Sequence, residues 1–141
     1  MDGRSAPGQA GAEGGGATEA AVERPVLLMF RRPPYGTVFP AEGLRMVEAL
    51  LAFEMPVQAV FVEDGIFNLV KGQGNRTLGF GDLGAAFANL AAQGLRELLV
   101  LQEDLAARRV RVEDLVDAPV RPIRITELRA LIDRAKVVMP F

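Results

Sequence analysis

The chain has 141 residues, half of them apolar and about a quarter charged, with a net charge of −2, which fits one globular domain. It contains no cysteine and no histidine, which excludes disulfides, persulfide chemistry and the commonest metal ligands. The near-neutral charge argues against nucleic-acid binding, and no apolar run is long enough to cross a membrane. We therefore expect a soluble, cytoplasmic protein with no metal or cofactor.

The N-terminal residues 1–24 differ in composition from the rest of the chain. They hold six of the 15 glycines and almost no large apolar side chain. Such a segment cannot bury enough surface to offset the entropy lost on ordering, so we expect a disordered tail. Residues 25–141 are then expected to form a single domain.

Five short apolar runs in that domain have the length and composition of buried strands. The fourth is the weakest because a proline interrupts it. In chain order the predicted strands are Pro25–Arg31, Val57–Glu63, Arg96–Leu101, Val120–Ile125 and Lys136–Met139.

Helical periodicity lies between these runs, and it predicts an α/β fold: three α/β/α layers around a mostly parallel sheet of about five strands. In such sheets, ligands bind beyond the carboxyl ends of the strands. The predicted helices run from Pro40 to Phe53, from a cap at Asp82 to Gly94, near Asp104–Arg109, near Glu113, and from a cap at Thr126 with Leu128, Leu131 and Ile132 facing inward.

The first predicted strand ends in a pair of arginines, Arg31 and Arg32, followed by a proline-stiffened loop that contains Tyr35. Two guanidinium groups beside a stiff loop could hold a small anion. The pattern favours a solvated loop, because prolines stiffen loops whether or not a ligand binds.

The second predicted strand ends in Glu63-Asp64-Gly65. Two adjacent carboxylates could bind a hard cation or act as a base, but no histidine or third ligand is near and Asp-Gly is an ordinary turn signal. The next residues are unusually apolar for a loop, so they either cover the domain's own core or form a patch for another subunit. The predicted interface comprises Asp64, Phe67, Leu69, Val70, Lys71 and Gln73.

Two further patterns have ordinary explanations. Residues Gly79–Gly84 match G-x-G-x-x-G, but 14 residues separate them from Asp64, whereas a dinucleotide-binding motif follows its strand directly. The glycines therefore indicate a tight loop and close helix packing. The basic cluster Arg108, Arg109 and Arg111 fits a solvated helix end, with a docking patch for an acidic partner as the alternative.

The chain from the Pro-Pro-Tyr-Gly loop at 33–36 through Glu63–Gln73 resembles the DsrE/DsrF family, and it is most similar to the DsrF/TusC branch of sulfur-relay subunits. The glycine-containing helix start Ala41–Leu44 and the C-terminal strand closing on an aromatic, Val137–Phe141, also resemble that branch. The likeness covers essentially residues 26–141.

The resemblance implies a three-layer α/β/α domain and a hexamer of three related subunits, two copies each, that passes sulfane sulfur to a small carrier protein. In the sulfur-carrying branch a cysteine follows the third strand, which corresponds to Leu101 or Gln102 here. Because this chain has no thiol, we expect a non-catalytic subunit that assembles with related DsrE/DsrH-like subunits. The alternative is a free-standing DsrE-like homo-oligomer that binds a small anion near Arg31, Arg32 and Tyr35.

Overall fold

Strands and helices alternate within residues 23–72 and 82–141, the parts of the chain that the computed structural model describes. The predicted tail lies outside them, apart from its last two residues. The strands are β1 (Val26–Phe30), β2 (Val57–Phe61), β3 (Leu98–Leu101), β4 (Val120–Ile123) and β5 (Val137–Pro140). The α-helices are α2 (Phe39–Ala52), α3 (Leu83–Asn89), α4 (Gln102–Ala107) and α5 (Ile125–Arg134), and the 3₁₀ helices are η2 (Glu63–Leu69), η3 (Leu90–Gln93) and η4 (Val112–Asp114).

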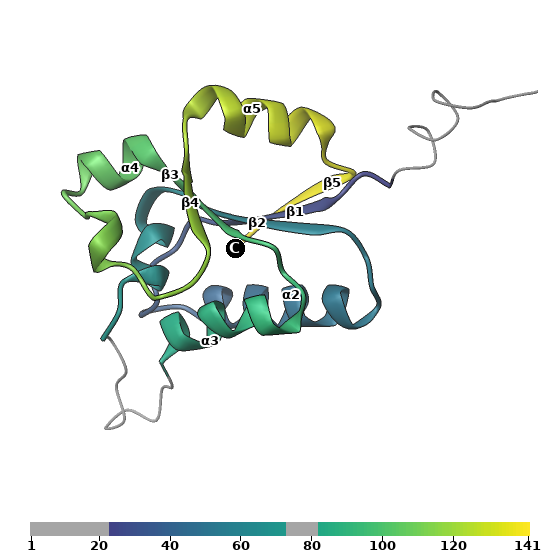
Figure 1. Ribbon diagram of the computed structural model, residues 1–141, viewed down its shortest axis with the longest axis horizontal. Helices are drawn as coiled ribbons and strands as arrows, with labels where there is room; N and C mark the ends of the chain where they lie inside the picture. Colours follow the sequence, from purple (N-terminus) through teal and green to yellow (C-terminus); the bar gives the residue numbers. More distant parts are fainter. Residues whose placement is uncertain (1–22, 73–81) are drawn as a thin grey trace, which may run out of the picture.

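The five strands form one sheet in the order β4-β3-β2-β1-β5, and every neighbouring pair is parallel. The connections from β1 to β4 all step toward the same edge, and the last connection runs back across the sheet to β5. Because such crossovers are right-handed, the reversal places α5 on the face opposite α2 and α3, as Figure 1 shows. The predicted three-layer α/β/α fold is confirmed.

The larger core lies between the sheet and α2 with α3, and three phenylalanines fill its centre. Phe30 on β1 stacks on Phe61 of β2 with ring centroids 4.7 Å apart, and Phe87 of α3 meets each of them edge-on at 5.0 Å. Gly43 of α2 faces the Phe30 ring so closely that a Cβ atom would overlap it. This glycine therefore lets α2 approach the sheet at the carboxyl end of β1.

The opposite face has a smaller core, in which α5 covers the sheet through Leu128 and Leu131. Ile132, which the periodicity predicted to face inward, is 39% exposed, so that prediction is wrong. Within the described residues α5 covers this face, and neighbouring positions along one helix cannot all point at the sheet.

The start of α5 also differs from the prediction, which made Thr126 the cap. The helix begins at Ile125, whose backbone N–H donates to the Glu103 carboxylate at 3.1 Å. This hydrogen bond is the main reason that the pKa of Glu103 lies below its ordinary value. A carboxylate from α4, distant in sequence, therefore takes the place expected of the local Thr126 hydroxyl.

The other predicted helix boundaries are close to those observed. Pro40 lies in the first turn of α2, and the Asp82 carboxylate accepts the Ala85 backbone N–H at 3.1 Å to cap α3. Gly94 ends η3 with a φ of 112°, in the left-handed region that glycine adopts at low cost. Local sequence signals suffice at these three positions.

Candidate functional site at the carboxyl edge of the sheet

The carboxyl ends of β1, β2 and β3 bring three segments together: the loop after β1, the η2 segment and the start of α4. The Arg31 Nε atom lies 3.2 Å from Glu63 Oε1, so the first strand end pairs with the second. The Glu63 backbone N–H donates to Asp104 Oδ2 at 2.6 Å, which ties the second strand end to α4. We call this region the carboxyl edge.

The backbone conformation at Glu63-Asp64-Gly65 restricts which residues fit there. Glu63 has a φ of 52°, in the left-handed region that costs a non-glycine residue free energy. A Cβ atom on Gly65 would overlap the carbonyl group of Phe30, because the chain crosses directly over the end of β1. Asp64 and Gly65 therefore lie in the first turn of the 3₁₀ helix η2, and only glycine fits at position 65.

Burial along η2 and the residue after it repeats with the period of a 3₁₀ helix, in which side chains at positions i and i+3 eclipse. One side of the segment is buried and consists of Gly65, Ile66, Asn68 and Leu69. The other side carries exposed Asp64 and partly buried Phe67, and the partly buried Val70 follows at the same spacing. The run therefore covers the domain's own core, one of the two roles that the sequence left open. Its inward side is buried, and Phe67 and Val70 pack against the same core while remaining partly exposed.

The predicted interface residues divide between these two sides. Asp64, Phe67 and Val70 lie three residues apart on the outward side of the segment, and the exposed Lys71 follows the end of η2. We call these four residues the outward stripe. Leu69 has no exposed surface and packs in the larger core, so the structure assigns it to the domain interior instead of to a partner contact. Gln73 lies outside the described residues.

Asn68 is a structural residue that the sequence analysis did not single out. Its side chain is fully buried, and its Nδ2 atom donates to the Arg32 carbonyl at 2.8 Å and to the Gly65 carbonyl at 3.0 Å. These bonds tie η2 to the loop after β1. The sequence signal that could have identified Asn68 is a single amide within an apolar run, because buried polar side chains are almost always hydrogen-bonded.

The carboxylates at this edge are paired with arginines. Arg108 at the end of α4 lies 3.0 Å from Asp64 and 3.3 Å from Asp104, while Glu63 pairs with Arg31. Among the described residues, no group of three or more acidic, histidine or cysteine side chains could hold a metal ion. Arg108, predicted as part of a solvated helix end, instead joins α4 to η2.

The contacts of Arg31 and Arg32 weaken the case for the predicted anion site. Arg31 is engaged by Glu63, and the Arg32 guanidinium lies over the Phe39 ring at 4.3 Å. Both arginines line a hollow of about 100 Å³ with aromatic and proline side chains, and Tyr35 is exposed nearby in sequence but is not among the lining residues. The remaining lining residues are Phe39, Pro140 and Phe141.

The position expected for a sulfur-carrying cysteine falls at the junction of β3 and α4. Leu101 ends β3 and is buried, and Gln102, the first residue of α4, is exposed at the carboxyl edge. The amide of Gln102 cannot form a persulfide. No thiol is present at this junction or at any other position of the sequence.

The G-x-G-x-x-G motif at Gly79–Gly84 lies only partly within the described residues, because 79–81 are outside them. Its last glycine, Gly84, packs in α3 against Val116, and a Cβ atom there would come within 3.0 Å of that side chain. The η2 segment separates the motif from β2, so close helix packing is the role that the described part fits. In the described ranges, none of the helices has the length and apolarity to cross a membrane.

Comparison with known proteins gives consistent matches. Residues 24–141 match the family model of the DsrE/DsrF-like family. The intracellular sulfur oxidation protein DsrF of Allochromatium vinosum is 28% identical over 120 residues, which cover 82% of this chain and 88% of the relative. A TusC homolog of Aliivibrio fischeri is 28% identical over 88 residues, covering 62% of this chain and 75% of the relative. The crystal structure of the ychN protein from E. coli has the same fold, with a TM-score of 0.73 at 20% identity, covering 84% of this chain and all of that one.

Proposed function

The chain belongs to the DsrE/DsrF-like family, and from this membership we propose that it is a cysteine-free subunit of an intracellular sulfur-relay complex. In this role it assembles with related subunits in the cytoplasm and supports their chemistry without carrying sulfur. The names of the DsrF and TusC relatives support the relay, and the absence of any thiol in the sequence supports the non-catalytic part.

The observation that carries the proposal is Gln102, which is exposed at the carboxyl end of β3, on the same edge of the sheet as η2. A persulfide requires a thiolate, and neither this position nor any other in the sequence provides one. Sulfur transfer at this edge would therefore need a cysteine from a partner. The outward stripe offers that partner a mixed apolar and charged surface, with Phe67 as its aromatic anchor.

The test is purification of the tagged chain from its source, with identification of the subunits that accompany it. We expect a stoichiometric partner that is related in sequence and contains a cysteine. On incubation with a sulfane-sulfur donor, the partner should gain the mass of a sulfur atom and this chain should gain none. A chain that purifies alone, or that itself acquires covalent sulfur, would contradict the proposal.

Two matched variants locate the surface. Phe67→Asp places a charge in the proposed interface and should release the partner while circular dichroism stays native. Phe53→Asp makes the same change at a side chain that is 79% exposed at the end of α2, and it should leave the complex intact. Retention of the partner by Phe67→Asp would remove the outward stripe from the interface.

The free-standing alternative, a homo-oligomer that binds a small anion near Arg31, Arg32 and Tyr35, has weaker support. The hollow between the two arginines has a volume of about 100 Å³, well below the roughly 300–1,000 Å³ of typical metabolite sites. Glu63 also neutralises Arg31. Light scattering that shows a stable homo-oligomer, with phosphate protection that Arg32→Gln abolishes, would favour this alternative.

A further inference from the structure

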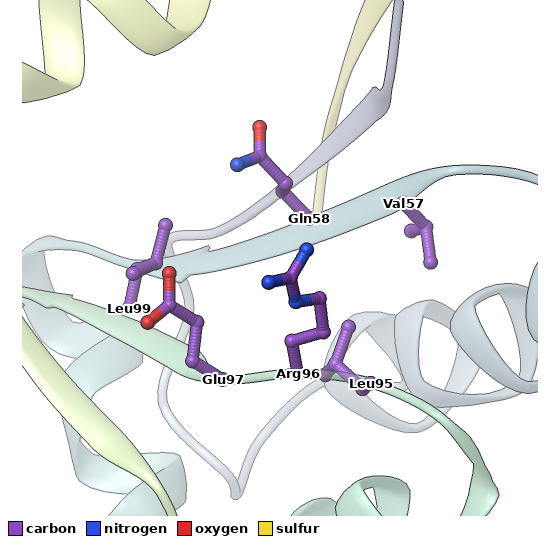
Figure 2. A pocket seen from close by; sticks show the side chains of 6 residues that line it. All are labelled: Val57, Gln58, Leu95, Arg96, Glu97 and Leu99. Atoms are coloured by element: carbon purple, nitrogen blue, oxygen red, sulfur yellow. The ribbon is translucent and has the colours of Figure 1, made fainter. Parts of the chain in front are cut away.

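The sheet has two edge strands, β4 and β5, and within the described residues each has one side without a neighbouring strand. The inner strands offer no comparable place. A hollow of about 460 Å³ lies where the starts of β2 and β3 separate (Figure 2), but the two strands pair from Ala59 and Leu98 onward, so no further strand can enter between them. A strand from another chain could therefore join this sheet only beside β4 or β5.

The outer side of β4 has no N–H group left to donate. The Pro119 carbonyl accepts the Leu98 N–H at 2.9 Å and so faces β3, and the alternation of a parallel ladder then turns Val120 and Pro122 outward. The Val120 N–H already donates to the Ala118 carbonyl at 2.7 Å, and a proline has no N–H. β4 is therefore a closed edge.

The outer side of β5 is open. The Lys136 N–H donates to the Pro25 carbonyl at 2.8 Å, so Lys136 and, by the same alternation, Val138 face β1. Val137 and Met139 therefore turn their N–H and C=O groups away from the sheet, and no hydrogen bond within the described residues reaches these outward groups. β5 presents donors and acceptors at the spacing of a strand.

Apolar side chains flank this open edge on the face of the sheet that α2 covers. A Cβ atom on Gly43 would come within 2.9 Å of the ring of Phe141, the residue after β5, so this flank of α2 lies toward β5. Phe39 and Met46, four residues before and three residues after Gly43, lie on the same flank. Phe39 is exposed, Met46 is partly buried, and Val137 on β5 itself is 47% exposed.

The face covered by α5 has a matching apolar flank. Glu127 pairs with Arg121 of β4 at 2.9 Å, so that flank of α5 lies toward β4. Ile132 comes five residues later, and at about 3.6 residues per turn it lies on the opposite flank, toward β5. Its side chain is exposed near the end of α5, which leads into the start of β5 (Figure 1). A strand added beside β5 would therefore cover apolar side chains on both faces of the sheet.

The charges near the open edge are cationic and unpaired. Lys136 directly precedes β5, and Arg129 lies three residues before Ile132 on the same flank of α5. Both side chains are exposed, and neither forms an ion pair with any described residue. Two copies of this chain that paired through β5 would bring these cations together, whereas an acidic segment would neutralise them.

We propose that β5 is the docking site for an extended, acidic segment of a partner chain, which adds to the sheet as a sixth strand. The outward groups of Val137 and Met139 select an extended backbone, because a helix uses its own N–H and C=O groups internally. Alternate side chains of the segment pack beside α2 and α5, and its acidic residues lie near Lys136 and Arg129. The inference does not rest on the proposed function, because the outward stripe follows β2 and this edge belongs to β5.

The test uses the blocked peptide Glu-Val-Thr-Val-Thr-Val-Glu, titrated into the full ¹⁵N-labelled chain. We expect saturable amide shifts at β5 and slower hydrogen exchange of the Val137 and Met139 amides. The same peptide N-methylated along its backbone should bind more weakly by about tenfold or more, because it has no N–H donors. A peptide with lysine in place of both glutamates should also bind about tenfold more weakly. An absence of saturable shifts at β5, or equal binding of the N-methylated peptide, would overturn the proposal.

Variants of β5 separate the backbone contribution from the side chain. Val137→Pro removes an outward N–H while leaving those that bond to β1, so it should weaken peptide binding by about tenfold with a native circular dichroism spectrum. The matched control Val137→Ala keeps the N–H and should weaken binding less. Equal binding by the two variants would contradict the assignment.

Two further measurements exclude other readings of this edge. Phe67→Asp should leave peptide binding unchanged, so failure at β5 is distinguishable from failure of the interface at the outward stripe. Light scattering of the chain without peptide should show no association that Val137→Pro abolishes. Self-association of that kind would mean that β5 pairs with a second copy of the chain, and it would overturn the acidic partner.

Discussion

The two sides of the segment from Glu63 to Lys71 differ in what they contact. The inward side is fixed by the chain itself: Gly65 lies against the Phe30 carbonyl, Asn68 binds two carbonyl groups, and Leu69 fills the core. The outward stripe packs on the chain only in part, and its polar ends are exposed. The comparison teaches that one short segment can hold a fold together and still present a surface. Within η2 the 3₁₀ period separates Asp64 and Phe67 from the buried side chains, and Val70 and Lys71 follow the end of the helix.

The largest effect should come from Gly65→Ala. A Cβ atom would overlap a backbone carbonyl that cannot move without displacing β1, and we expect a loss of about 4 kcal/mol in the free energy of unfolding. Urea denaturation measures it. The control is Gly72→Ala, where φ is 81° but the space is open, so the cost should be only about 1 kcal/mol. Equal losses would show that the crossing over β1 is not tight.

Leu69→Ala and Phe67→Ala compare the stability contributions of the inward and outward sides of the segment from Glu63 to Lys71. Leu69 is fully buried, and its truncation should cost about 3 kcal/mol through lost burial and the cavity left behind. Phe67 is only partly buried, and its truncation should cost about 1 kcal/mol in the isolated chain. Thermal unfolding of both variants under one condition tests the order. The reverse order would place Phe67 in the core and weaken the proposed interface.

Asn68→Ala removes the buried amide that joins η2 to the loop after β1. The Arg32 and Gly65 carbonyls would each lose a donor, which should cost about 2 kcal/mol. Chemical denaturation gives the loss, and Asn89→Ala at an exposed position of α3 is the matched control with little expected change. An Asn68→Ala chain as stable as the control would mean that the two carbonyls find other donors.

Arg108→Gln should have the smallest effect, because Asp64 is exposed and the ion pairs of Arg108 with Asp64 and Asp104 are only partly buried. We expect a loss below about 1 kcal/mol that shrinks further in high salt. Unfolding curves at low and high ionic strength measure both quantities, with Arg129→Gln as the control. A larger, salt-independent loss would mean that Arg108 holds η2 in place to the same degree as the inward side chains.

Much of the fold could be predicted from local patterns. Five apolar runs predicted the five strands to within two residues at each end, and Pro40, Asp82 and Gly94 marked helix boundaries correctly. The resemblance to the DsrE/DsrF family agrees with the family match. The site was only partly predictable: the residue range 63–71 was identified, but the roles of Asn68 and Arg108 depend on partners more than 30 residues away.

The sequence by itself determined the strand and helix order and the absence of any thiol, because composition and periodicity are properties of the chain alone. The tertiary structure decided which side of η2 faces inward, since that depends on where β1 ends and where α4 packs. It likewise placed Leu69 in the core. It also made the Glu103 carboxylate, in place of the Thr126 hydroxyl, the hydrogen-bond acceptor at the start of α5. A local pattern gives the spacing of side chains, and contacts between distant segments decide which of them remain at the surface.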